Sequence, residues 1–151
     1  MALEQEIQQS SFASEQAKLI VNLIYSYNIL KGRIMDELKE YGLTMQQYNV
    51  LRIVKGAGSE GVTTSEIRDR MLDKMSDASR MVDRLVAMEL LEKNRYKEDR
   101  RLFHIELTNR GNDIITSLVQ ESLIEQIALD FPNKNAQQLN ELLDDFRASI
   151  G

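Results

Sequence analysis

The segment that most constrains the fold is residues 63–90, TTSEIRDRMLDKMSDASRMVDRLVAMEL, which reads as two helices joined by a very short connection. Thr63 and Glu66 have the spacing of a capping box, in which two side chains bind backbone N–H groups at the start of a helix. The connection DKMS leaves room only for a tight turn. This segment is therefore predicted to be a helix-turn-helix.

The second helix of this motif, predicted over about residues 76–89, has two different faces. At about 100° per residue its apolar side chains share one side. These are Ala78, Met81, Val82, Leu85 and Met88. The other side carries Ser76, Arg80, Asp83, Arg84 and Ala87, with Asp77 and Ser79 at its edges. One face is thus predicted to pack, and the other to face solvent or a partner.

Two alternating segments, LLEKNRY and RLFHIEL, follow the motif at once. In the second, Phe103, Ile105 and Leu107 point to one side and the residues between them to the other, which is the period of a β-strand. The polar KED between the segments is typical of a turn. Residues 91–107 are therefore predicted to form a β-hairpin, and a helix-turn-helix followed by such a hairpin is a winged helix.

Amphipathic segments precede this motif. Residues 12–41 are predicted to form one long helix that ends at Gly42, because apolar residues recur there at steps of three and four. The segment LTMQQYNVLRIV opens the next helix, with Thr44 and Gln47 at capping-box spacing.

Two further helices are predicted after the hairpin. Thr108 is the expected N-cap of the first, which Pro132 interrupts, and the last helix occupies residues 135–150. The fold class is therefore mainly α (α+β). The chain is predicted to be a single domain over residues 1–151, with a winged helix-turn-helix region, 44–107, between flanking helices, 12–41 and 108–150.

The charge is unevenly distributed along the chain. The net charge is −5 overall, made up of −1 for residues 1–62, +1 for residues 63–110 and −5 for residues 111–151. Basic residues are thus concentrated in the predicted winged helix. Because a nucleic-acid interface is usually local, the acidic total is compatible with DNA binding.

The exposed side of the second helix and the hairpin tip suit double-stranded DNA. The major groove admits one α-helix, and its phosphates attract basic groups at the edges. Short Ser76 and Ser79 permit close approach, whereas Arg80 and Arg84 reach base edges or phosphates. The hairpin tip adds Lys97, Arg100 and Arg101. The alternative is a winged-helix protein-interaction module that does not bind DNA.

Taken in order, the segments LTMQQYNVLRIV, TTSEIRDRM, SDASRMVDRLVAMELLEK, EDRR and IELTNRG resemble the MarR (multiple antibiotic resistance regulator) family of winged-helix transcriptional regulators. The resemblance covers about residues 20–130. It implies a cytoplasmic homodimer, joined through its terminal helices, that binds a palindromic operator. A repressor released by an effector is the function that it implies.

The resemblance also implies roles for individual residues. The recognition helix would carry Ser76, Asp77, Ser79, Arg80 and Arg84, and Thr63 would lie near the DNA. Arg101 would be the wing arginine that enters the minor groove, with Asp99 orienting the tip and Asp83 able to pair with a wing arginine. Glu89 stands where the family usually has glycine.

Family regulators often bind small lipophilic, often aromatic effectors, for which Tyr25, Met45 and Tyr48 are candidate contacts; ordinary core or interface packing is the alternative. Neither a cofactor nor a metal is expected, because the chain has no cysteine and a single histidine, His104. No catalytic constellation is recognisable, so an enzyme is not predicted. No apolar run is long enough to cross a membrane.

Overall fold

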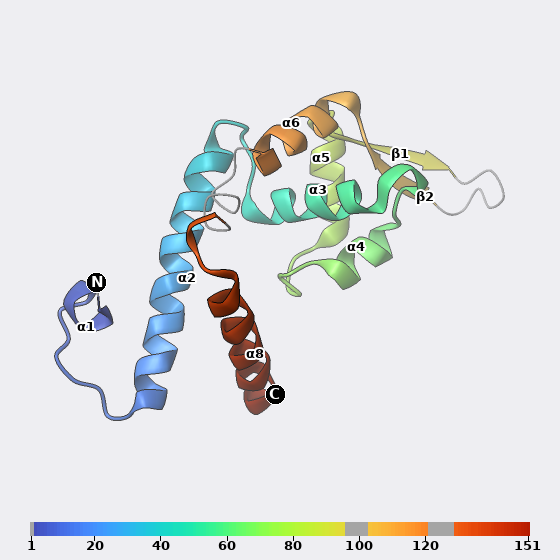
Figure 1. Ribbon diagram of the computed structural model, residues 1–151. Helices are drawn as coiled ribbons and strands as arrows, with labels where there is room; N and C mark the ends of the chain where they lie inside the picture. The colour runs from blue at the N-terminus through green and yellow to red at the C-terminus, as the bar shows by residue number, and fades with distance from the viewer. Residues whose placement is uncertain (1, 96–102, 121–128) are drawn as a thin grey trace. The chain divides into compact units, whose positions relative to one another are not determined.

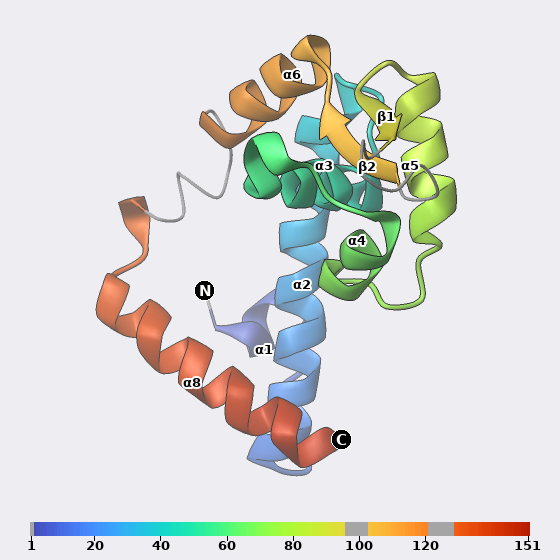
Figure 2. The same cartoon turned by 90° about the vertical axis from the view of Figure 1, so that its right-hand side faces the viewer.

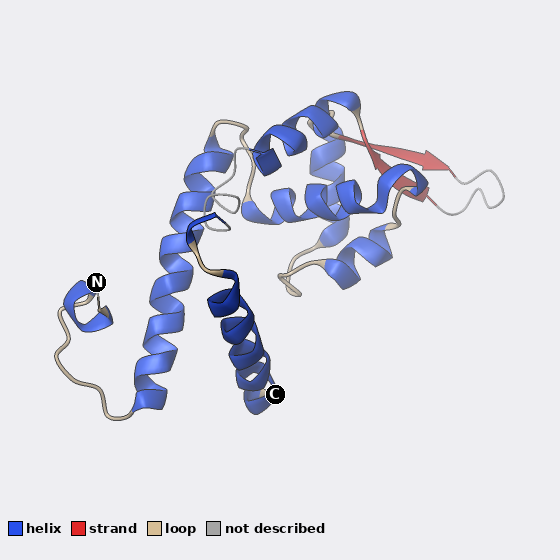
Figure 3. Ribbon diagram, in the orientation of Figure 1, coloured by secondary structure: helices blue, strands red, loops and turns tan. Residues whose placement is uncertain are grey.

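The computed structural model describes residues 2–95, 103–120 and 129–151 and divides the chain into two compact units, Met1–Gly42 and Leu43–Gly151. The first unit contains the short helix α1, Leu3–Glu6, and the long helix α2, Glu15–Lys39 (Figure 1). The second contains α3 to α6, the hairpin and α8. Its hairpin is the only sheet among the described residues (Figure 3). The predicted mainly helical winged-helix fold is confirmed.

Helix α2 begins and ends inside the predicted range of 12–41. Ser14 caps it by accepting a hydrogen bond from the backbone nitrogen of Ala17 (3.1 Å), and Gly42 follows its end with a φ of +65°. The sequence did not predict α1. This short helix is held on α2 by an ion pair between Glu4 and Lys18 (2.5 Å), which joins residues far apart in the sequence.

Helix α3, Met45–Ala57, lies at the centre of the second unit and contacts α4, α5, α6 and β2 (Figure 2). The predicted capping box is present. Gln47 donates its backbone N–H to Thr44 Oγ1 (3.2 Å), and the Thr44 N–H donates to Gln47 Oε1 (2.9 Å). Val50 and Leu51 of α3 are fully buried. The helix is followed by a single 3-10 turn, Gly58–Glu60.

The helix-turn-helix consists of α4, Thr64–Arg70, and α5, Ala78–Ala87. The hairpin follows it, with β1, Leu91–Arg95, antiparallel to β2, Phe103–Leu107. Leu91 pairs with Leu107, and Arg95 pairs with Phe103. The segment before α4 also joins the sheet, because Val62 exchanges two backbone hydrogen bonds with Ile105 (2.8 and 3.1 Å). This bridge was not predicted.

Thr108 joins the hairpin to helix α6, Asn109–Gln120. Its Oγ1 accepts a hydrogen bond from the backbone nitrogen of Gly111 (3.0 Å), as predicted for an N-cap, and its hydroxyl donates to the Glu89 carbonyl (2.7 Å). A Cβ atom on Gly111 would overlap the carbonyl of Leu90. Glycine is therefore required where the first turn of α6 meets the link between α5 and β1.

The last helix, α8, spans Asn133–Ile150 and begins just after Pro132, two residues earlier than predicted. None of its residues is buried. Its apolar residues Leu139, Leu142 and Ile150 are exposed, at 46, 65 and 68 %. No helix in the described part of the chain is both long enough and apolar enough to cross a membrane.

Candidate nucleic-acid interface

Helix α5 has the two faces that its sequence predicts. Val82 and Leu85 are fully buried, and Ala78 is 5 % exposed. The opposite side carries exposed polar side chains, namely Ser79, Arg80, Asp83 and Arg84. Because α5 packs on α3, α4 and β1 through its apolar side, its polar side faces solvent.

The recognition helix is shorter at its start than the predicted range of 76–89. Asp77 lies outside the helix as its N-cap, and its carboxylate accepts a hydrogen bond from the backbone nitrogen of Arg80 (3.0 Å). Ser76 precedes the cap and donates its hydroxyl to Asp73 (2.8 Å). The placement of Ser76 and Asp77 on the helix was thus wrong. Short polar side chains bind the unpaired N–H groups of a helix start in preference to continuing the helix.

Helix α5 ends earlier than predicted as well. Its last helical residue is Ala87, and Glu89 has a φ of +58°. This left-handed conformation usually requires glycine, which agrees with the glycine expected at this position from the family resemblance.

Thr63 is committed to the capping box at the start of α4. Its hydroxyl donates to Glu66 Oε2 (2.7 Å) and accepts from the Glu66 backbone nitrogen (3.2 Å). Hydrogen bonds from the Thr63 backbone and then from its hydroxyl hold the pKa of the Glu66 carboxyl below its usual value. The Thr63 side chain therefore positions α4, and its contact with DNA stays a prediction.

Two arginines dominate the exposed side of α5. Within the described ranges, neither the Arg80 nor the Arg84 side chain forms an ion pair or a hydrogen bond. Guanidinium groups remain charged at all accessible pH values and carry five donors. Two positive charges, one helical turn apart, are therefore available for phosphates or base edges.

Asp83 lies between these arginines and is bound to Lys93 of strand β1, with Nζ 2.5 Å from Oδ1. The sequence predicted a wing arginine as its partner and missed Lys93. The ion pair ties the recognition helix to the hairpin and offsets a negative charge that would repel phosphate. The sequence shows that Lys93 belongs to the predicted strand. It does not show which residue of α5 the Lys93 side chain faces, because that depends on how the strand packs against the helix.

The predicted wing residues Lys97, Asp99, Arg100 and Arg101 lie outside the described residues. At the end of the described part of the hairpin, the Arg95 guanidinium lies over the Phe103 ring, 5.5 Å from its centre. Arg95 therefore adds a positive charge next to the tip. Phe103 is 42 % exposed, although the alternating pattern places it on the same side of the strand as the buried Ile105.

His104 lies on the other side of β2, where it is largely covered. Its Nε2 is 3.6 Å from the Glu106 carboxylate, which also accepts a hydrogen bond from the Asn94 amide (2.9 Å). Among the described residues, no three histidine, aspartate or glutamate side chains are grouped in a way that could hold a metal ion.

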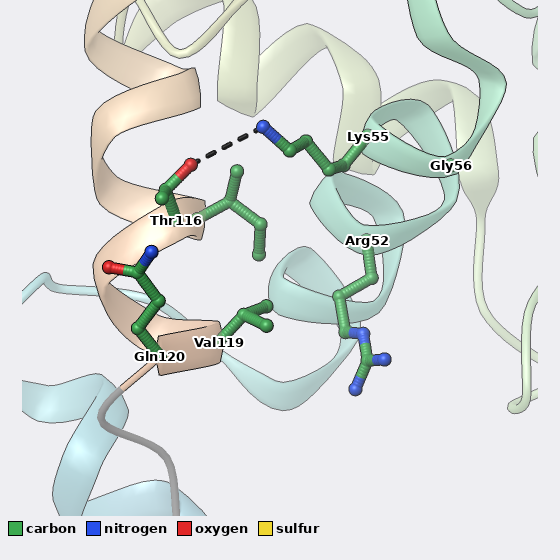
Figure 4. A pocket seen from close by; sticks show the side chains of 7 residues that line it. Arg52, Lys55, Gly56, Thr116, Val119 and Gln120 are labelled. Carbon is green, nitrogen blue, oxygen red and sulfur yellow. Dashed lines mark hydrogen bonds between the residues drawn. The ribbon is translucent and has the colours of Figure 1, made fainter. Parts of the chain in front are cut away.

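A cavity of about 350 Å³ lies between α3 and α6 (Figure 4). Its lining comprises Arg52, Lys55, Gly56, Ile115, Thr116, Val119 and Gln120. Lys55 Nζ donates to Asn112 (2.5 Å) and Thr116 (3.3 Å), and the Arg52 guanidinium lies 5.9 Å from the centre of the Tyr48 ring. The cavity thus combines an apolar wall with two positive charges.

The predicted effector residues do not line this cavity. Tyr48 is buried in α3, and Met45 is half-buried in the first turn of the same helix. Tyr25 belongs to α2, where its hydroxyl donates to Glu6 (3.0 Å). That hydrogen bond raises the Tyr25 pKa. Their role as effector contacts stays a prediction.

A short helix, a tight connection, a helix with exposed arginines and an antiparallel hairpin together form a winged helix-turn-helix, a motif typical of DNA-binding regulators of transcription. Residues 33–118 match the family model for the transcriptional regulator SarA/Rot, so the chain belongs to the SarA/Rot family of transcriptional regulators. The resemblance to MarR-type regulators is confirmed, and this family consists of DNA-binding regulators, not enzymes.

Individual relatives agree with this assignment. The chain is 26 % identical over 140 residues to the HTH-type transcriptional regulator SarZ of Staphylococcus epidermidis, covering 91 % of this chain and 90 % of SarZ. It is 31 % identical over 83 residues to the HTH-type transcriptional repressor MdtR of Bacillus subtilis. That match covers 55 % of this chain and spans about half, 52 %, of MdtR.

Solved structures show the same fold. A putative MarR-like transcription regulator from Bacillus cereus superposes with a TM-score of 0.69, covering 91 % of this chain and 99 % of that protein at 18 % identity. At this identity the similarity establishes the fold alone.

Proposed function

We propose that this chain is a homodimeric, sequence-specific regulator that places α5 of each subunit in the major groove of one half of a palindromic operator. The observation that carries this proposal is the exposed pair Arg80 and Arg84, opposite the buried face of α5. The major groove is about 12 Å wide and accepts one α-helix. Two half-sites about one helical turn apart then require twofold symmetry.

Ser79, Arg80 and Arg84 are the residues proposed to contact DNA from the helix itself. Arginine recognises guanine through two parallel hydrogen bonds, and short serine lets the backbone approach. Asp83 is neutralised by Lys93 and is assigned to holding the hairpin, so it does not contact DNA in this proposal. Ser76 and Asp77 are proposed to act through the start of α5, where backbone N–H groups favour phosphate.

The hairpin is proposed to act as the wing, with Arg101 in the minor groove, Asp99 orienting it, and Lys97 and Arg100 at the flanking phosphates. A narrow minor groove has an enhanced negative potential that attracts arginine. The sequence supports this assignment by placing all four residues between β1 and β2. Arg95, on the described part of the hairpin, adds positive charge on the same element.

Dimerisation is proposed to use α2 and α8. Each presents large apolar residues to solvent at helical spacing, which in a folded chain marks a surface for a partner. Those of α2 include Ile20 (50 % exposed), Ile24 (57 %) and Tyr27 (54 %). Family members are typically dimeric, which supports a second copy as the partner. Truncation after Phe131 is expected to abolish the dimer in analytical ultracentrifugation, and a dimeric truncated chain would refute this assignment.

Regulation is proposed to be repression, released by a small molecule in the cytoplasm. Two sites are candidates for it: the predicted residues Tyr25, Met45 and Tyr48, and the cavity between α3 and α6. The cavity suits a small apolar anion because Arg52 and Lys55 provide charge above the apolar wall formed by Ile115 and Val119. A ligand favouring one spacing of the two α5 helices would shift the population away from the DNA-binding state.

The test is selection of bound duplexes from a random pool, followed by a salt titration. A palindromic consensus, bound with an affinity that falls steeply with salt, is expected for a dimer that neutralises several phosphates. Arg101→Ala should weaken operator binding by about 1–3 kcal/mol and leave the dimer intact. If no duplex is enriched, the alternative of a protein-interaction module replaces this proposal.

A further inference from the structure

The connection between α4 and α5 (Figure 2) presents two large apolar side chains almost entirely to solvent. Leu72 is 86 % exposed and Met75 is 93 % exposed. Single apolar residues are common on protein surfaces, so exposure by itself means little. Leu72 and Met75 differ from such single residues in two respects: hydrogen bonds fix the backbone that carries them, and they lie next to α5.

The connection is held by hydrogen bonds from side chains to its backbone. The Leu72 backbone nitrogen donates to Asn49 Oδ1 in α3 (2.9 Å). The Asp73 carboxylate accepts from the Met75 backbone nitrogen (3.0 Å) and from the Ser76 hydroxyl (2.8 Å). The backbone that carries Leu72 and Met75 is therefore fixed against the same helix that supports α5.

The connection also lies directly before the proposed DNA-reading helix, with Met75 two residues ahead of the cap Asp77. A helix whose first turn enters a groove brings the preceding residues to the same groove. Lys74 stands between the two apolar residues, and Arg80 lies in the first turn of α5. The carboxylates of Asp73 and Asp77 offset this positive charge. It is therefore the position of the pair, directly before α5, that favours the molecule bound by α5 as the one that covers it.

We propose that Met75 and Leu72 recognise thymine through its 5-methyl group in the major groove, an inference that rests on the proposed binding of DNA by α5. The methyl group is the apolar feature on the major-groove edge of a base pair and distinguishes thymine there. Burial of one such group is worth about 0.8 kcal/mol, which corresponds to an affinity change of about four-fold. Met75 and Leu72 thereby add to the specificity supplied by Arg80 and Arg84.

The experiment replaces thymidine by deoxyuridine, one position at a time, in a duplex that the wild-type dimer has selected. Deoxyuridine keeps the hydrogen-bonding groups of thymidine and lacks only the methyl group. At one or two positions in each half-site, the wild type should lose about four-fold in affinity. Met75→Gln and Leu72→Asn keep side-chain size and remove apolar character. Each variant should bind the thymidine and the deoxyuridine duplex with equal affinity when the replaced base is the one that the residue contacts.

Two controls separate this contact from a general effect. Met75→Leu stays apolar and should keep the methyl dependence. Deoxyuridine placed outside the two half-sites should leave the affinity of the wild type unchanged. Circular dichroism checks that each variant is folded, which the exposure of both Leu72 and Met75 favours.

Three outcomes overturn the inference, and they are distinguishable. Unchanged wild-type affinity after every thymidine has been replaced refutes it while DNA binding stands. A methyl dependence that persists in full in both Met75→Gln and Leu72→Asn assigns the methyl contact to other residues. Failure of the wild type to enrich any duplex removes the proposed function itself, and this inference with it.

Discussion

Glu89 follows the end of α5 and has a φ of +58°, a conformation that costs an L-amino acid about 1–2 kcal/mol. Its carboxylate lies 3.7 Å from the Arg110 guanidinium, with the two side chains 83 and 64 % exposed. An ion pair this exposed contributes about 0–1 kcal/mol. Glu89 therefore affects the stability of the fold in two ways, through its backbone conformation and through its ion pair with Arg110. Two substitutions at this position distinguish the two effects.

Both Glu89→Ala and Glu89→Gly remove the ion pair, so the difference between them reports the backbone alone. Glycine adopts positive φ without penalty, but it loses about 0.5–1 kcal/mol more chain entropy on folding than alanine. The net expectation is that the glycine variant is more stable than the alanine variant by about 1 kcal/mol. For a chain of this length that corresponds to about 2–4 °C in Tm.

The assay is urea unfolding followed by circular dichroism, at one fixed protein concentration because the proposed dimer would contribute to stability. Operator affinity serves as the control, since neither substitution touches Arg80 or Arg84, and it should stay within about two-fold. Equal stability of the two variants, or a less stable glycine variant, would refute the reasoning. In that case the left-handed conformation of Glu89 does not lower the stability of the fold.

Three other predictions concern packing, the link to the hairpin and pH. Gly111→Ala should lower the free energy of unfolding by about 1–3 kcal/mol, because its Cβ would overlap a backbone carbonyl. Gly32→Ala, with open space around it, should instead stabilise α2 by up to about 1 kcal/mol in the same urea unfolding assay. A double-mutant cycle with Asp83→Ala and Lys93→Ala should give a coupling of about 0.2–1 kcal/mol, and strict additivity would contradict their ion pair. The folded-state pKa of Glu66 is lowered, so the stability that its carboxylate contributes is complete above the ordinary carboxyl pKa and is lost as the pH falls through the folded-state pKa. Glu66→Gln should therefore reduce the loss of stability at acid pH. An unchanged profile of stability against pH would count against the capping box.

The starts of α3, α4 and α6 were predicted accurately. The capping boxes of Thr44 with Gln47 and of Thr63 with Glu66 are both present, and Thr108 caps α6. These interactions join residues three apart, so their spacing is visible in the sequence whatever the rest of the chain does. The start of α5 was misplaced because Ser76 and Asp77 are both good caps, and the choice between them depends on Asp73.

The division of α5 into two faces was likewise readable, because helical periodicity fixes which side chains share a side. The sequence alone is therefore enough to propose Arg80 and Arg84 as DNA contacts. The roles of the wing residues, of the terminal helices and of the effector contacts remain predictions. Each depends on DNA, a second subunit or a ligand, none of which a single chain contains.

The sequence by itself determined the longer helices, the caps of α3, α4 and α6, the hairpin and the resemblance to MarR-type regulators, because each rests on residues that lie close together in the chain. Only the tertiary structure decided the pairing of Asp83 with Lys93, the crossing of α6 over Leu90 at Gly111, and the cavity between α3 and α6. It also decided that α1 folds back on α2. Each of these contacts joins residues distant in the chain, and so depends on the path of the backbone between them, which local periodicity does not specify.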